Sequence, residues 1–147
     1  MLVDKANSLT RQARLAAAVF SQYSQEQVDR IVKAMTTCAI NNAALLAKMA
    51  HEETRMGVTE DKILKNLVAS EFLYAQIKDA KTVGVIKELP ELNMVEVAEP
   101  IGVILGLAPV TNPTSTIIFK MISFAKTRNS IIFSSHLRAA ESSNLAA

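Results

Sequence analysis

The stretch AEPIGVILGLAPVTNPTST, residues 98–116, decides the fold of this chain. Its centre, Gly102–Leu107, is a short continuous apolar run, which is typical of a strand buried on both faces of a parallel sheet. Pro113 suits the first position of a helix, with Thr111 or Asn112 as the cap before it. The stretch therefore predicts a strand, a tight turn and a helix start, which bring polar side chains to the carboxyl edge of an α/β sheet.

The same alternation continues downstream. We expect the helix to run to about Lys126, a second buried strand at Ser130–Phe133, and a further helix over Leu137–Ala147. Strand, helix and strand in this order form a βαβ unit with a right-handed crossover. Two parallel strands cannot form a finished core. We therefore expect an incomplete sheet whose other strands come from sequence outside this chain, in preference to self-association or poor folding.

The first half of the chain is predicted to be helical. Ser24-Gln-Glu-Gln27 fits a capping box, Gly57 suits a left-handed helix end, and Thr59 is placed to cap a helix over 60–79. We expect that last helix to bury an apolar face made of Ile63, Leu64, Leu67, Val68 and Phe72.

Near residue 80 the pattern changes from helical to extended. Thr82–Lys87 and Met94–Ala98 predict a pair of strands, joined through the break at Pro90. The α/β chain thus divides into a helical segment (1–80), a strand pair (81–99) and a βαβα segment (100–147).

The composition excludes several function classes. The chain has 147 residues, half of them apolar, and a formal net charge of +2, which is too small to argue for nucleic acid or an anionic membrane. The longest apolar stretch, Ile101–Val110, falls short of the ~20 residues that span a bilayer, and no signal-peptide pattern opens the chain. We expect a cytoplasmic protein with neither nucleic acid nor membrane as a partner.

Two groups of potentially reactive side chains are interpreted as structural. Cys38 lies mid-helix with no basic residue positioned to activate it, and we expect a small buried hydrophobe. His51 beside Glu52 and Glu53 hints at a metal cluster, but adjacent helical residues point in different directions. We therefore expect a solvated helix end and no metal site.

Asn112 is the leading candidate for chemistry, because its amide could donate to an oxyanion developing on a bound carbonyl. The alternative is that it merely caps the helix. Before it, the backbone of Leu107–Thr111 leaves room at Ala108 and Pro109 for a flat ligand, or is an ordinary strand exit. No GxGxxG phosphate loop occurs in the chain. Ser134 and His136, after the second strand, could bond a ribose or simply form a loop.

Residues 98–139 resemble the CoA-acylating branch of the aldehyde dehydrogenase superfamily, in particular the N-terminal half of the bifunctional aldehyde–alcohol dehydrogenases. Upstream, strings around Gln25–Asp29, Leu46–Ala50 and Glu60–Lys62 match the same family, so the resemblance spans the whole chain. The carrying motifs are Ala98-Glu-Pro-Ile-Gly102, Pro109-Val-Thr-Asn-Pro-Thr-Ser-Thr116, Phe119-Lys120, Lys126-Thr-Arg-Asn129 and Ile131-Ile-Phe-Ser134.

The resemblance implies a reversible reaction in which a cysteine thiolate attacks an aldehyde, hydride passes to NAD, and coenzyme A takes the resulting thioester. It implies that Asn112 is the oxyanion-hole amide, and that Ser134 and His136 lie on the adenosine-ribose side of the dinucleotide. The strand pair would serve oligomerisation, which makes a homo-oligomer the expected state. The first stretch to touch the dinucleotide would be Leu107, Ala108, Pro109, Val110, Thr111 and Asn112.

Two departures from the family pattern qualify these expectations. The family's Ser-Pro-His-Pro-Arg is Ser134-Ser-His-Leu-Arg138 here, which loosens a turn that two prolines would fix. The sequence also stops before the family's nucleophilic cysteine, and covalent catalysis needs its nucleophile. We therefore expect an N-terminal fragment of an acetaldehyde dehydrogenase (acetylating) that is inactive alone. The alternative is a decayed or repurposed fragment that acts as an assembly piece.

Overall fold

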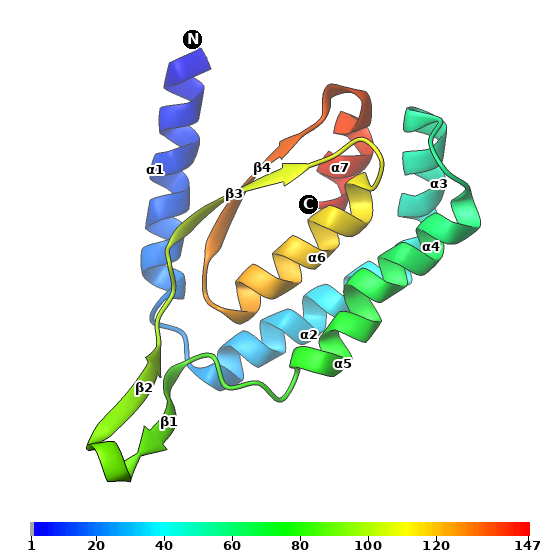
Figure 1. Cartoon of the computed structure of the whole chain (residues 1–147). Coiled ribbons are helices and arrows are strands. Elements are labelled where there is room, and N and C mark those ends of the chain that lie inside the picture. The colour runs from blue at the N-terminus through cyan, green and yellow to red at the C-terminus, as the bar shows by residue number, and fades with distance from the viewer. Residues whose placement is uncertain (1) are drawn as a thin grey trace.

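The computed structural model describes residues 2–147, without the side chain of Leu2, as helices and two small sheets (Figure 1). Met1 lies outside the described residues. The first half contains α1 (Leu2–Phe20), α2 (Gln25–Asn41), α3 (Ala43–Thr54), α4 (Thr59–Leu67), a π-helical turn (Val68–Phe72) and α5 (Leu73–Ile77). The second half contains β1 (Gly84–Leu89), a 3-10 turn (Pro90–Leu92), β2 (Met94–Ala98), β3 (Val103–Ala108), α6 (Pro113–Lys126), β4 (Ser130–Ser135), a 3-10 turn (Leu137–Ala139) and α7 (Ala140–Ala146).

The βαβ unit that the sequence predicts is present. β3 and β4 are parallel and in continuous register from Val103 opposite Ser130 to Ala108 opposite Ser135. α6 makes the crossover between them, beginning at Pro113 and ending at Lys126. The β3–β4 sheet has two strands only, so the expected incomplete α/β sheet is confirmed within residues 2–147.

The core is built around α6. Ile117, Ile118 and Ile122 are at most 1% exposed, and they pack with Val28 and Val32 of α2 in one apolar cluster. Figure 1 shows α6 between the β3–β4 sheet and α2. α6 thus connects the β3–β4 sheet with the helical half of the molecule through apolar packing.

The sheet is covered less completely than the sequence predicts. Gly106 and Ala108 of β3 are buried, but Leu105 and Leu107, which alternate with them, are 66% and 61% exposed. Successive side chains of a strand point to opposite faces, so the prediction that Gly102–Leu107 is buried on both faces is wrong for this chain. The alternation leaves an apolar face of β3 open.

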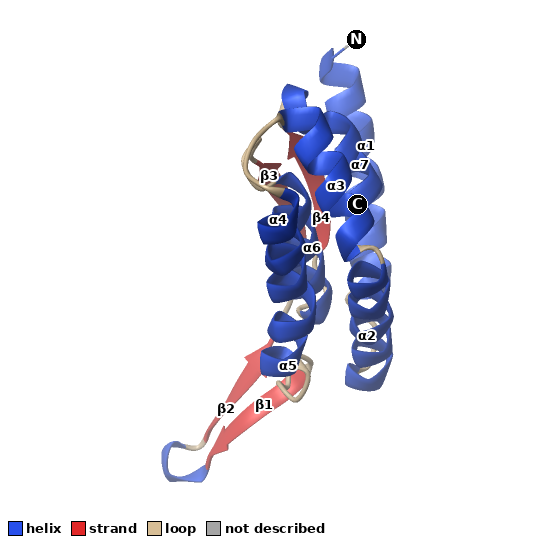
Figure 2. Ribbon diagram, turned by 90° about the vertical axis from the view of Figure 1, so that its right-hand side faces the viewer, coloured by secondary structure: helices blue, strands red, loops and turns tan. Residues whose placement is uncertain are grey.

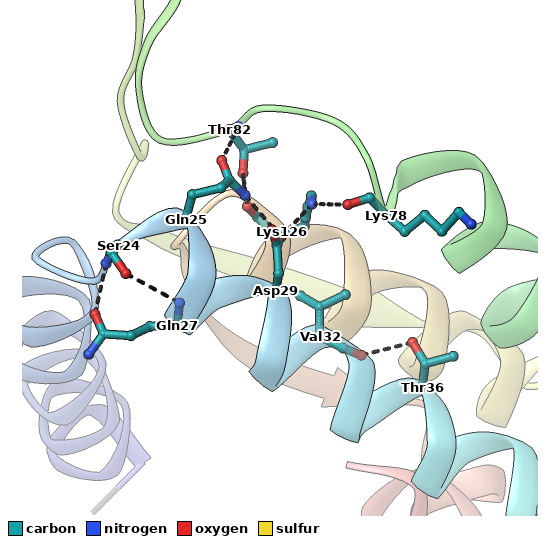
Figure 3. A network of polar contacts seen from close by, with 9 residues as sticks. All are labelled: Ser24, Gln25, Gln27, Asp29, Val32, Thr36, Lys78, Thr82 and Lys126. Carbon is teal, nitrogen blue, oxygen red and sulfur yellow. Dashed lines mark hydrogen bonds and ion pairs between the residues drawn. The ribbon is translucent and has the colours of Figure 1, made fainter.

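The strand pair forms an antiparallel hairpin, β1–β2, that projects away from the rest of the molecule in two perpendicular views (Figures 1 and 2). Its base is fastened to the body by Thr82, whose backbone N–H donates to Gln25 Oε1 at 2.8 Å and whose hydroxyl donates to the Lys126 carbonyl at 2.5 Å (Figure 3). The beginning of α2 and the end of α6 therefore set where the hairpin leaves the domain.

Helix ends agree with the sequence in one case and differ in another. Ser24 and Gln27 form the predicted capping box at the start of α2. α3, however, ends at Arg55 in the left-handed conformation, with φ 58°, and not at Gly57. The cap before α4 is Val58, and Thr59 is already helical without a capping hydrogen bond, so the predicted cap is wrong.

The buried face of α4 also differs from the prediction. Leu64, Val68 and Phe72 are between 52% and 58% exposed. The side chains that face the interior are polar or small, and they are satisfied there: Asn66 donates to the Ala43 carbonyl at 2.9 Å and accepts from the Thr114 hydroxyl at 2.9 Å. The prediction is therefore wrong for the three exposed residues, whereas Ile63 and Leu67 of the same face are half-buried. None of the helices within residues 2–147 combines the length and apolar character needed to cross a bilayer.

Candidate functional site at the carboxyl edge of the sheet

The parallel register brings together the residues predicted to hold a dinucleotide. Leu107 pairs with Ser134 and Ala108 with Ser135, at the carboxyl ends of β3 and β4. The His136 N–H donates to the Ala108 carbonyl at 3.1 Å, which ties the two strand exits together. Ser134, His136 and Pro109 are exposed at this edge, whereas Ala108 is only 5% exposed.

Asn112 lies at the next step along this edge, in the loop Pro109–Asn112 that leads into α6. It is the N-cap residue, and its carbonyl accepts from the Thr116 N–H, but its side chain makes no capping hydrogen bond. The side-chain NH2 instead donates to the Thr111 hydroxyl at 3.3 Å, and Oδ1 accepts from Lys65 Nζ at 3.0 Å. Capping therefore does not account for the amide, which remains available to a ligand.

Lysine side chains from two helices bond to the backbone at the end of β3 and in the loop that follows it. Lys62 Nζ of α4 donates to the Thr111 carbonyl at 3.0 Å, and Lys120 Nζ of α6 donates to the Leu107 carbonyl at 2.6 Å. Lys62 is only 5% exposed. Its burial, with a contribution from the positive charge of Lys65, lowers the pKa of Lys62 below the ordinary lysine value. None of these lysines was predicted to be a site residue. The sequence does show that Lys62 and Lys65 are three residues apart on one helix and therefore share a face.

A groove of about 720 Å³ opens beside Asn112. One wall is the exposed apolar face of α4 and the π-helical turn, with Leu64, Val68 and Phe72. The opposite wall comes from the first turns of α6 and includes Phe119. Leu64, Val68 and Phe72, which were predicted to lie in the core, thus line a groove that also includes Asn112.

The remaining candidate residues lie away from this groove. Cys38 is exposed on α2, so the prediction that it is buried is wrong, and it borders a separate cavity of about 350 Å³. Glu53 is not simply solvated. It accepts hydrogen bonds from the backbone N–H groups of Glu141 and Ser142, both at 2.9 Å, and from the Ser142 hydroxyl at 2.6 Å. Within residues 2–147 no group of three or more His, Cys, Asp or Glu side chains could hold a metal ion.

The relatives found by sequence and by structure are both aldehyde dehydrogenases. No family model matches the chain. The chain is 46% identical over 145 residues to the bifunctional aldehyde-alcohol dehydrogenase AdhE of Escherichia coli K12. This alignment covers 99% of the chain and 16% of the E. coli protein. The crystal structure of an acetylating aldehyde dehydrogenase from Geobacillus thermoglucosidasius superposes with a TM-score of 0.96 at 42% identity, over 99% of this chain and 32% of the other. The chain therefore spans about a sixth to a third of the length of these relatives.

Two further solved structures, each 30% identical with a TM-score of 0.76, carry ligands. The propionaldehyde dehydrogenase of Rhodopseudomonas palustris contains bound CoA and an acylated cysteine. An engineered glycolyl-CoA reductase contains bound NADP+. Each match covers 95% of this chain and 32% of the other.

Proposed function

We propose that this chain supplies the oxyanion-binding and first dinucleotide-binding portion of a CoA-acylating aldehyde dehydrogenase. The premise is that it is homologous, over its whole length, to the N-terminal part of these enzymes. The complete reaction converts acetaldehyde, CoA and NAD to acetyl-CoA and NADH. The observation that carries the proposal is the Asn112 amide, which lies at the carboxyl edge of the sheet and lines an apolar groove without capping its helix.

Asn112 would act on the carbonyl oxygen of the aldehyde. When a nucleophile attacks the carbonyl carbon, negative charge develops on that oxygen, and an N–H donor already in place stabilises it by about 3 kcal/mol. The positive end of α6, a helix of 14 residues, adds to the same effect. Once the groove is covered, the apolar walls contributed by Leu64, Val68 and Phe119 would exclude water and so strengthen both interactions.

The nucleophile would come from sequence beyond this chain. Cys38 is the chain's single cysteine, and it borders a different cavity from the one beside Asn112. The acylated cysteine of the R. palustris enzyme shows that a relative uses such a group. Covalent chemistry therefore requires a second portion of protein to cover the groove.

We expect the carboxyl edge of β3 and β4 to contact the dinucleotide. The hydroxyl of Ser134 and the imidazole of His136 are exposed where β4 ends, next to the end of β3. His136 Nδ1 accepts from the Arg138 N–H at 3.1 Å, so Nε2 carries the proton in the neutral ring and can donate to a ribose hydroxyl. The same hydrogen bond holds the 3-10 turn that two prolines would otherwise fix. The bound nicotinamide would accept the hydride.

A chimeric enzyme tests this proposal. Residues 1–147 would replace the matching segment of the acetylating aldehyde dehydrogenase of G. thermoglucosidasius, and NADH formation would be followed with acetaldehyde and CoA. We expect Asn112→Ala to lower kcat about 100-fold, and Asn144→Ala, an exposed asparagine on α7, to leave it unchanged. An Asn112→Ala chimera with kcat close to that of the parent chimera would refute the proposed role.

A second function, assembly, is favoured by the projecting hairpin. Val85, Val95 and Val97 are each about half exposed on a strand pair that, within residues 2–147, is hydrogen-bonded to no third strand. We propose that this hairpin joins subunits into a homo-oligomer, since exposed apolar strands of this kind pair with other chains.

A further inference from the structure

α4 approaches the Asn112 loop with two cations on neighbouring turns. Lys62 and Lys65 are three residues apart, which places them on the same side of the helix. Each donates to a consecutive residue of the loop, Lys62 to the Thr111 carbonyl and Lys65 to Asn112 Oδ1. Among residues 2–147 neither lysine has a carboxylate within ion-pair distance. Their charge is therefore directed at the loop and is not neutralised by an acidic side chain.

The contact with Lys65 fixes which way the Asn112 amide points. A lysine ammonium has three donors and no acceptor, so only the oxygen of an amide can face it. The other neighbour, the Thr111 hydroxyl, both donates and accepts, and it would accommodate either orientation of the amide. Lys65 alone decides that Oδ1 is turned toward α4, which leaves the N–H that does not bond to Thr111 for a ligand.

We propose that Lys65 is a positioning residue, which orients and polarises the Asn112 amide so that its N–H groups bind the oxyanion. An ammonium that bonds to an amide oxygen withdraws electron density from the nitrogen, and this strengthens the N–H groups as donors. Lys62 has a distinct task, since it holds the backbone of the loop through Thr111 and touches no atom of the amide. This inference rests on the proposed function of Asn112.

The chain itself gives a direct readout. In the full 147-residue protein, the side-chain NH2 of Asn112 should give nitrogen and proton resonances that shift in Lys65→Met. Lys87→Met makes the same change of charge on the hairpin and should leave those resonances in place. The remaining backbone resonances report whether each variant keeps its fold. Unchanged Asn112 side-chain resonances in a folded Lys65→Met protein would overturn the inference.

The chimeric enzyme separates this inference from the proposed function. We expect Lys65→Met to lower kcat about 10-fold, because the amide loses both its fixed orientation and its polarisation, with little change in the KM for NAD or CoA. Lys65→Arg should restore most of kcat, because guanidinium is also a pure donor. In an Asn112→Ala background, Lys65→Met should have no further effect on kcat.

The possible results are distinct. If Asn112→Ala leaves kcat unchanged, the proposed function fails, and this inference fails with it. If Asn112→Ala lowers kcat and Lys65→Met does not, only the inference about Lys65 fails. An equal loss from Lys65→Met with and without Asn112 also overturns it, because Lys65 would then act through another group.

Discussion

Lys126 Nζ lies 2.6 Å from Asp29 Oδ1 and joins residues that are 97 positions apart in the sequence (Figure 3). The lysine side chain is 3% exposed, and its ammonium also donates to the Lys78 carbonyl at 2.9 Å. Asp29 accepts in addition from Gln25 Nε2 at 2.9 Å. One buried cation thus connects the end of α6 with α2 and with the segment that follows α5.

Removing this cation should destabilise the fold. Lys126→Met keeps the aliphatic stem but leaves Asp29 and the Lys78 carbonyl without the ammonium, and we expect the free energy of unfolding to fall by about 2 kcal/mol. The estimate is moderate because the Asp29 side chain is 40% exposed and water can replace part of the interaction. Urea unfolding measures the loss. Lys48→Met, which breaks an exposed pair with Glu52 at 3.9 Å, is the control and should change stability by less than about 0.5 kcal/mol. Equal effects from the two variants would contradict the prediction.

The βαβ unit could be predicted because its signals are local. Pro113 after Thr111 and Asn112 favours a helix start, and the apolar runs at Gly102–Leu107 and Ser130–Phe133 favour strands because they are short and are flanked by turn residues. The position of Asn112 follows from those bounds. Its contact with Lys65 does not, because the two residues are 47 positions apart and only the packing of α4 on α6 brings them together.

The exposed face of α4 could not be assigned for a different reason. Periodicity shows that Leu64, Val68 and Phe72 form a stripe, but it does not say what the stripe contacts. Asn66 is the residue that α4 buries, because its amide hydrogen-bonds to partners on α3 and α6 that an apolar residue would leave unpaired. Cys38 is a similar case: its apolar neighbours suggested burial, but it lies on the exposed side of α2.

Stability should depend on pH through Glu53. Burial opposes its ionisation, but the hydrogen bonds from Ser142 and from the N–H of Glu141 outweigh burial and lower the pKa of Glu53 below the ordinary value of 4.5. A carboxylate with a depressed pKa stabilises the folded state above its unfolded pKa and loses that contribution as pH falls through the folded pKa. Glu53→Gln should therefore cost stability at neutral pH, and the difference from the unmodified chain should shrink below about pH 4.5. Unfolding experiments from pH 3 to 7 measure this, with Glu52→Gln as the exposed control. A difference that does not vary with pH would contradict the role of the carboxylate.

Gly106 should not accept a side chain without loss. A Cβ at this position would lie 2.7 Å from Ile131 Cδ1 and 3.0 Å from ring atoms of Phe133, both on β4. The neighbours are side-chain ends that can move, so we expect Gly106→Ala to lower the free energy of unfolding by about 1 kcal/mol. Phe133→Leu in the same background should recover part of the loss by making room. If Gly106→Ala proves neutral, the two strands are less tightly packed than their register implies.

Self-association should depend on the hairpin and not on the groove beside Asn112. Sedimentation velocity over a range of concentrations should show that the 147-residue chain forms larger species as its concentration rises, because the hairpin exposes Val95 and Val97 on strands with free edges. Val95→Thr with Val97→Thr keeps β-branched residues and should shift the chain toward monomer without loss of folding stability. Phe72→Gln removes a comparably exposed apolar side chain from the groove and should leave association unchanged. A monomer at every concentration would contradict the assembly role. If Phe72→Gln reduced association more than the valine substitutions do, the interface would lie at the groove that the rest of the enzyme is proposed to cover.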